Sequence, residues 1–192
     1  MATSWVEICN LALISLGAET ITQLEEDTNN AQLCRAIYRG AADEVLSEHE
    51  FACAEARQDL NKLAAEPVGV LWHFQYQLPV NFLKIRSVDP DSPYERSGPV
   101  IFSNQESLTL VYTYQVTNPQ ALDAHVGRAI SAKIAFILAP KIVHKDKFTA
   151  YSEGQYERAL MKARWAEIKK KKDQDVDLLS DQSLPDNWEE VH

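Results

Sequence analysis

The segment Trp72–Pro79 alternates between apolar and polar residues, and it lies between two long segments with helical periodicity. A period of two places the apolar residues of this segment on one face of a β-strand: Trp72, Phe74, Tyr76 and Leu78. We expect these side chains to form the core of a small sheet and not a binding site. The alternation therefore predicts a helical protein that carries an inserted β module.

Length and charge narrow the class of protein. A chain of 192 residues is long enough to bury the core of one domain. Its formal net charge of -9 argues against a general affinity for nucleic acid, because phosphate binding depends on clustered Lys and Arg. An acidic surface past which DNA slides remains compatible with this charge.

Capping signals predict two helices before the β module. The first begins at the capping box Ser4–Glu7 and ends before Gly17. The second begins at Thr28 or Asn29 and continues with apolar residues at helical spacing. Gly40 in the middle of this helix is expected to allow a close contact with another helix, since glycine otherwise weakens a helix.

Two more helices are predicted after the β module. The third begins at Asn118–Pro119, where the asparagine caps the helix and the proline occupies its first position. Pro140 is expected to kink or end this helix. The fourth helix is predicted from Asp146 to Lys172, with its final lysines near the negative end of the helix dipole.

Between the helical segments, turn residues separate several short apolar segments. We expect these segments to pair in one small antiparallel sheet of about four strands. The predicted strands cover residues 51–60, 72–79, 82–88 and 108–116, with short ones at Tyr94 and Val100–Phe102.

The predicted fold class is α+β, mainly a helical bundle of about four helices with an inserted antiparallel sheet and an extended C-terminal tail. Residues 1–50 are expected to form the first helical pair and residues 51–117 the β module. Residues 118–172 are expected to form the second helical pair. The chain becomes polar and acidic after this point, so residues 173–192 are predicted to be an extended docking tail.

No familiar catalytic, metal-binding or cofactor-binding motif occurs in the sequence. The three cysteines, Cys9, Cys34 and Cys53, are widely spaced, and we expect them to be small buried hydrophobic residues. The acids Glu25 and Asp27 are typical of a solvated loop, although two carboxylates held ~5–10 Å apart can cleave a glycosidic bond. The expectation is a protein without enzyme activity, cofactor or metal.

Two features near the end of the sequence are candidate contact sites. A lysine run forms either a solvated helix end or a contact for an acidic partner or a phosphate: Lys169, Lys170, Lys171 and Lys172. The acidic segment that follows carries apolar residues that a partner would have to bury, so it is either a frayed terminus or, as we predict, a docking tail. Its apolar residues are Val176, Leu178, Leu179, Leu184 and Trp188.

The order of several short segments is the most specific feature of the whole chain. These segments are Asn10–Leu13, Leu16–Gly17, Ala31–Tyr38, Glu44–Leu46, His49–Ala52, Trp72–Pro79 and Phe82–Lys84. Together they resemble the podovirus tail tubular protein A family of bacteriophage head-to-tail adaptor, or gatekeeper, proteins. The resemblance covers residues 4–172, and the chain departs from it at Glu50–Phe51, where many relatives carry Pro-Trp.

The resemblance implies a structural virion protein, assembled in the host cytoplasm, that forms a homo-oligomeric ring of twelve copies beneath the phage portal. The ring would extend the DNA channel and join the portal protein to the tail nozzle or tube, without contact to a membrane. The docking tail would reach along the portal. The β module would face the tail side or a neighbouring copy, with a candidate contact loop at Tyr94, Glu95 and Arg96.

Two other functions remain open from the sequence. A virion-associated enzyme that cleaves peptidoglycan would use acids such as Glu25, Asp27 or Glu44. A DNA-packaging or terminase-associated factor would bind duplex DNA in a salt-dependent manner.

Overall fold

A computed structural model describes residues 4–65, 67, 71–143 and 146–180 of the chain. Four α-helices and two small antiparallel sheets make up this described part, with about 51% helix and 20% strand. The predicted α+β class is therefore confirmed. The helices are α1 (Trp5–Ser15), α2 (Asn29–Glu48), α3 (Ala124–Ile142) and α4 (Asp146–Ser180).

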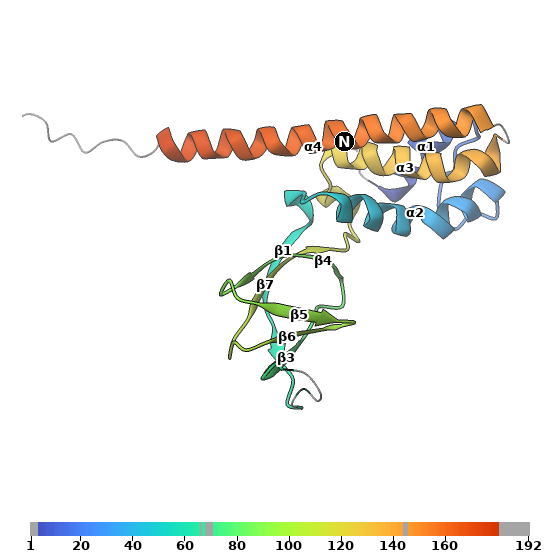
Figure 1. Ribbon diagram of the computed structural model, residues 1–192. Helices are drawn as coiled ribbons and strands as arrows, with labels where there is room; N and C mark the ends of the chain where they lie inside the picture. Colours follow the sequence, from blue (N-terminus) through green and yellow to red (C-terminus); the bar gives the residue numbers. More distant parts are fainter. Residues whose placement is uncertain (1–3, 66, 68–70, 144–145, 181–192) are drawn as a thin grey trace, which may run out of the picture.

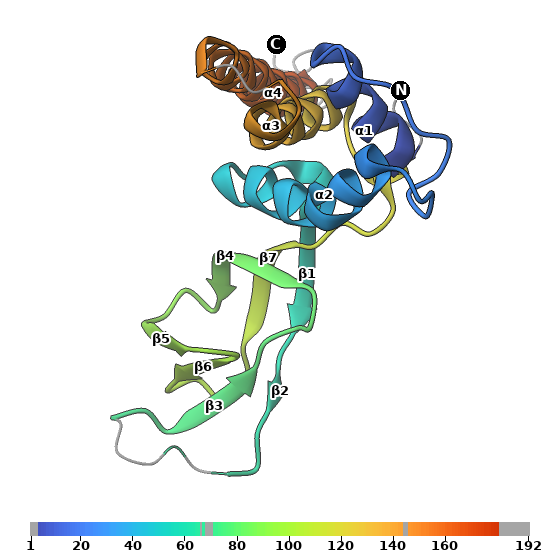
Figure 2. The same ribbon diagram turned by 90° about the vertical axis from the view of Figure 1, so that its right-hand side faces the viewer.

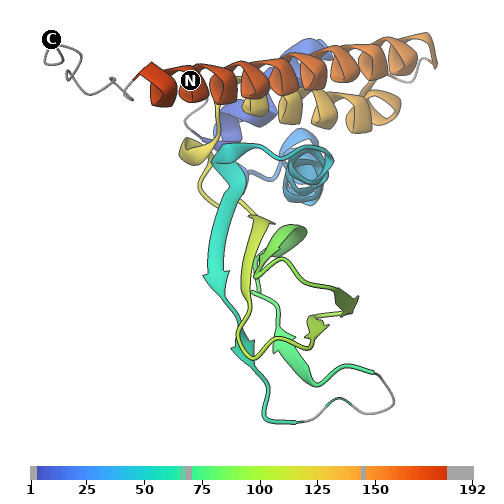
Figure 3. The ribbon, with the colours of Figure 1, turned by 60° about the vertical axis from the view of Figure 1, so that its left-hand side comes forward.

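The helices lie together at one end of the molecule, and the two sheets extend away from them (Figure 1). Helix α2 lies between the sheets and the other helices, whereas α1 and α4 lie on either side of α3 (Figure 2). The C-terminal part of α4 continues past the N-terminal end of α3 (Figures 1 and 3). One part of α4 is therefore packed in the helical layer and another part projects from it.

The starts of α1 and α2 confirm the predicted capping signals. The Ser4 hydroxyl accepts a hydrogen bond from the Glu7 amide at 3.1 Å, and the Thr28 hydroxyl accepts one from the Ala31 amide at 3.3 Å. Helix α1 ends at Ser15, before Gly17, whose φ of 69° lies in the left-handed region that glycine adopts without strain. These two helices begin and end where local chemistry predicts.

The predicted start of the third helix is wrong by five residues. The Asn118 side chain accepts a hydrogen bond from the Gln120 amide at 3.0 Å, but it caps only a short 3₁₀ turn, η2 (Pro119–Ala121). Leu122 is extended, so the chain leaves the helical conformation before α3 begins at Ala124. Pro140 lies inside α3, which ends two residues later at Ile142.

The predicted end of the fourth helix is also wrong. Helix α4 continues to Ser180, so the lysine run lies inside the helix and not at its end. The change to acidic composition after Lys172 alters the surface but introduces no glycine or proline, and the first helix-breaking residue is Pro185. Residues 173–180 are thus helical and not extended, and the remaining predicted tail, residues 181–192, lies outside the described residues.

The β module contains two sheets, so the prediction of a single sheet of about four strands is wrong. Strands pair antiparallel in the order β1-β7-β4 in one sheet and β2-β3-β6-β5 in the other. The strand bounds are β1 (Glu55–Asp59), β2 (Asn61–Lys62), β3 (Phe74–Gln77), β4 (Phe82–Asp89), β5 (Tyr94–Ser97), β6 (Val100–Ser103) and β7 (Thr109–Tyr114).

The chain passes from one sheet to the other at Leu60, which separates β1 from β2. The Leu60 amide donates to the Leu108 carbonyl at 2.8 Å, so this crossing point is itself fixed by a backbone hydrogen bond. Strand β3 is shorter than predicted, because Trp72 lies before it and donates its indole N–H to the Glu95 carboxylate at 2.9 Å. The predicted strand over 51–60 begins instead with a 3₁₀ turn, η1 (Ala52–Ala54).

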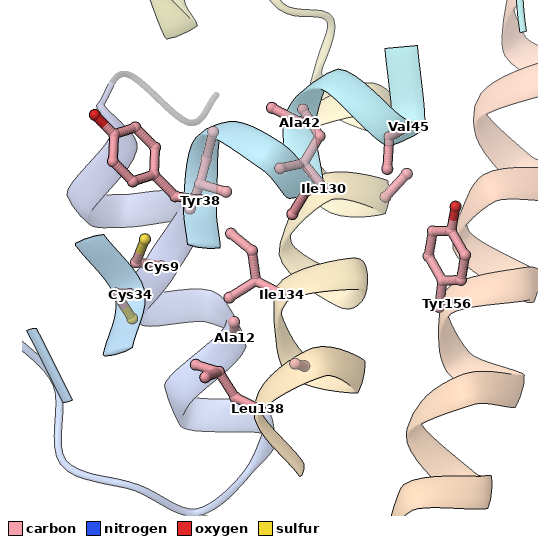
Figure 4. Close-up of a cluster of buried hydrophobic side chains, with 14 of the residues drawn as sticks. Cys9, Ala12, Cys34, Tyr38, Ala42, Val45, Ile130, Ile134, Leu138 and Tyr156 are labelled. Atoms are coloured by element: carbon pink, nitrogen blue, oxygen red, sulfur yellow. The ribbon is translucent and has the colours of Figure 1, made fainter. Parts of the chain in front are cut away.

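Two separate hydrophobic cores hold the molecule together. The larger core lies among the helices, and Figure 4 shows side chains of all four helices in it. The smaller core lies between the two sheets and includes Tyr76, Leu78, Leu110 and Tyr112. The inward orientation predicted for Tyr76 and Leu78 is confirmed, since they are 1% and 5% exposed. The Tyr76 hydroxyl donates to the Gln105 carbonyl at 2.6 Å, which satisfies the polar end of this buried ring.

The surroundings of Gly40 contradict the expectation that it allows a close contact with another helix. It is exposed on α2, and a Cβ added there would meet nothing within 4 Å. We therefore expect Gly40→Ala to raise the free energy of unfolding by about 0.5–1 kcal/mol, because alanine restricts the unfolded backbone and favours the helix. Urea denaturation monitored by circular dichroism measures this change.

The matched control is Gly17→Ala, which places a side chain at a φ of 69° and should lower the stability. Equal effects of the two substitutions would contradict this explanation.

Candidate functional site

The most unusual surface of the described chain lies on α4. Besides Tyr151 near its start, this helix exposes three large apolar side chains close together: Met161 by 54%, Trp165 by 66% and Ile168 by 51%. Their spacing of four and three residues places them on one side of the helix. We call this set the α4 stripe. A row of exposed apolar residues is typical of a contact surface, whereas a single one needs no explanation.

Lysines flank the α4 stripe. Lys162, Lys169 and Lys172 are exposed, and each stands three or four residues from a member of the stripe. Lys170 faces another direction and binds Asp123 with a distance of 2.6 Å between its Nζ atom and the carboxylate. This hydrogen bond raises the pKa of Lys170. The stripe therefore combines an apolar centre with a positively charged margin.

Two adjacent hollows open beside the stripe. One, of about 500 Å³, is lined by His125, Trp165, Ala166, Ile168, Lys169 and Lys172. The other, of about 340 Å³, shares His125 and Ala166 with the first and reaches the first turn of α3. Amides at a helix N-terminus favour negatively charged groups. The first hollow thus offers the charges of Lys169 and Lys172 next to apolar side chains, whereas the second is also lined by the acids Asp123 and Glu167.

Polar contacts on the opposite side of α4 hold this part of the helix in place. Glu167 is only 3% exposed, and its carboxylate accepts a hydrogen bond from the Ala52 amide at 3.0 Å. Arg164 and Tyr156 both bind Glu48 of α2, with Arg164 at 3.3 Å. Burial, together with the hydrogen bond to Glu48, raises the pKa of Tyr156. These contacts fix α4 so that the stripe faces away from the helical layer.

Arg86 joins the helices to the β module through the same stretch of chain. We call Phe51–Ala54 the junction segment. The Arg86 side chain is 4% exposed and donates to the Phe51 carbonyl at 2.6 Å, the Thr113 hydroxyl at 3.0 Å and the Glu55 carboxylate at 2.6 Å. Arg86 and Glu167 therefore hold the junction segment from the sheet side and from the helix side.

The structure separates the predicted contact residues. Tyr94, Glu95 and Arg96 lie exposed on β5, an edge strand of the second sheet, and Figure 1 shows β5 at the opposite end of the molecule from helix α4. The Arg96 guanidinium lies 4.8 Å from the centre of the Phe82 ring. The β5 residues and the lysine run thus belong to different surfaces of the molecule.

The predicted tail residues divide into two groups. Val176, Leu178 and Leu179 lie in the helical backbone of α4. Leu184 and Trp188 lie outside the described residues. The lysine run is visible in the sequence, but the α4 stripe was not predicted, because the apolar residues that pack inward, such as Tyr156 and Leu160, already account for one apolar face of the helix. One feature of the sequence does indicate the stripe, because apolar residues also recur on the opposite side of the same helix.

The acids considered for peptidoglycan cleavage lie apart from the α4 stripe. Glu25 and Asp27 are exposed in the loop before α2, and Glu44 forms an ion pair with Lys133 at 2.6 Å. None of these three acids lines the hollows beside α4. Two of the cysteines, Cys9 and Cys34, are buried as predicted, and Cys53 is partly buried, where desolvation raises the pKa of its thiol.

Searches for other kinds of site give negative results within the described ranges. Residues 4–65, 67, 71–143 and 146–180 contain no group of three or more His, Cys, Asp or Glu that could hold a metal ion. No helix of this part is both long and apolar enough to cross a membrane. Neither a protein-family model nor a curated protein matches the chain.

Proposed function

We propose that this protein is a non-enzymatic structural component of a phage virion, a ring-forming adaptor that joins the portal to the tail nozzle or tube. The observation that carries the proposal is the α4 stripe with its lysine margin on a helix that projects from the helical layer. A large apolar surface of this kind is stabilised when a partner covers it. The order of segments resembling the tail tubular protein A family supports the same function.

The proposed ring uses different surfaces on the two sides of each copy. A ring interface is heterologous, so one patch on a copy must meet another patch on its neighbour. Leu11 and Ile14 of α1 are 45% and 61% exposed, and α1 lies on the side of α3 opposite α4 (Figure 2). A mainly helical bundle with apolar residues on both flanks suits this arrangement. Twelve copies would then surround a channel.

The acidic charge fits a channel wall. With a net charge of -9, the protein would repel the phosphate backbone and allow DNA to move past without binding. The portal protein is the proposed partner at the α4 end, through the tail residues Val176, Leu178, Leu179, Leu184 and Trp188. The β module, with its exposed β5 strand, is the proposed contact for the nozzle or for a neighbouring copy.

Co-sedimentation with purified portal protein tests the docking part of this proposal. We expect the full chain to sediment with the portal, and a chain that lacks residues 181–192 to lose at least about tenfold in affinity, since several apolar residues leave the interface. Circular dichroism should show that the helices are retained, because the deletion leaves α4 (Asp146–Ser180) complete. Full binding by the shortened chain would place the contact elsewhere.

A further inference from the structure

We propose that, in the free protein, residues 181–192 of the same chain fold back and cover the α4 stripe. This contact goes beyond the proposed function, because it requires neither a portal nor a ring. The composition of the segment complements the lysines and the apolar residues of the stripe. It contains four acids and no Lys or Arg, together with three large apolar residues: Asp181, Asp186, Glu189 and Glu190, with Leu184, Trp188 and Val191.

The receiving surface is complementary in both respects. Its apolar centre is formed by Met161, Trp165 and Ile168, and its margin carries the exposed Lys169 and Lys172. A tryptophan ring from the segment can enter the hollow of about 500 Å³ beside Trp165, where ring contacts add to the burial of apolar area. Acids next to it then lie beside lysines, which favours this arrangement over a polar segment without charge.

The length of the segment fits the distance that it must cover. Helix α4 ends at Ser180, so Ile168 and Trp165 lie about 18 and 22 Å back along the helix axis at 1.5 Å per residue. The eight residues from Asp181 to Trp188 span at most about 26–29 Å when extended. Trp188 can therefore reach the level of Trp165 after the chain reverses direction.

Attachment to the same helix favours this occupant over a free partner. A segment tethered by a few residues has an effective concentration near the millimolar range, so even a weak contact is populated. The consequence for assembly is direct: a partner that binds this segment must first displace it from α4. A partner-dependent release would keep the apolar stripe and the tail from associating with other molecules before assembly.

Carbodiimide cross-linking of the full chain tests this contact. The reagent joins a carboxylate to a lysine amine as an amide, and the water that is lost converts the carbodiimide into a urea. Equal amounts of ¹⁴N-labelled and ¹⁵N-labelled protein are mixed before the reaction, and peptides are identified by mass spectrometry. We expect Lys169 or Lys172 to be linked to Glu189 or Glu190, with both peptides carrying the same isotope.

The reaction contains its own positive control. Lys170 and Asp123 lie 2.6 Å apart, so their link must form if the reagent works on folded protein. The proposal is overturned if that link forms while no link joins 181–192 to the lysines. Links of mixed isotope would also overturn it, because the segment would then come from another copy.

Two variants separate a specific contact from non-specific encounters between acids and lysines. Trp188→Ala and Trp165→Ala should each lower the yield of these links about tenfold, the change that corresponds to a loss of 1.4 kcal/mol. Leu71→Ala, at a side chain that is 96% exposed in the β module, should leave the yield unchanged. Unchanged yields in both tryptophan variants would contradict the contact. Portal co-sedimentation is scored separately, so failure of the adaptor function does not alter these outcomes.

Discussion

Replacing Arg86 with leucine is expected to lower the free energy of unfolding by about 3 kcal/mol. The guanidinium makes three hydrogen bonds while its side chain is only 4% exposed. Leucine fills much of the space but leaves the Phe51 carbonyl and the buried Thr113 hydroxyl without this donor. Buried polar groups that lose their partner account for most of the expected cost.

Arg57→Leu is the matched control. Arg57 forms an ion pair with Asp89 at 2.5 Å in the same sheet, but the two side chains are 63% and 60% exposed. Exposed pairs contribute about 0–1 kcal/mol, so this variant should remain close to the unchanged protein. Urea denaturation followed by circular dichroism measures both variants. Similar losses at Arg57 and Arg86 would show that burial of the guanidinium is not what matters.

Glu167→Leu is expected to cost about 2 kcal/mol and to loosen the junction segment selectively. The Glu167 carboxylate is the acceptor for the Ala52 amide, at a position where the acid is 3% exposed. Without this acceptor, α4 no longer holds the chain that leads into β1. Hydrogen exchange of the Ala52 amide should therefore become faster by a larger factor than exchange of the amides in α4.

Glu167→Gln separates the hydrogen bond from the charge. The amide oxygen of glutamine can still accept from the Ala52 N–H, so the stability and the exchange rate should change much less than with leucine. Two equally unstable variants would mean that the negative charge, and not the acceptor, holds the junction segment.

Local chemistry was sufficient to predict the elements that are held by their own residues. Ser4 and Thr28 cap their helices by hydrogen bonds that span three residues, so the signal and the structure lie in the same short segment. Tyr76 and Leu78 face a core, as the period of two predicts. In each case the structure has the contact or the side-chain orientation that the local sequence pattern predicts.

The errors arose where distant contacts decide the outcome. Asn118 has the sequence of a helix cap, yet Leu122 is extended and α3 starts later. The β module is divided by pairing between distant segments, and Leu60, where the chain first changes sheet, has its hydrogen-bond partner 48 residues away at Leu108. Pairing over such separations has no local signal, so the number of sheets could not be read from alternation.

The candidate site likewise combines one feature that is visible in the sequence with one that depends on packing. The lysine run was visible as a run of charge, but its position inside α4 depends on the helix continuing to Ser180. The α4 stripe is defined by what does not pack against it, and the sequence of one helix cannot show which of its two apolar sides meets α3. Exposure of Trp165 therefore became evident only in the folded chain.

Native mass spectrometry of the full chain mixed with purified portal protein tests the adaptor function most directly. We expect a closed complex in which about twelve copies are added to each portal, because a heterologous ring interface that closes on itself requires a fixed number of subunits. Intermediate numbers should be minor species. A chain that remains monomeric and leaves the portal unbound, under conditions where the portal itself is intact, would contradict the account.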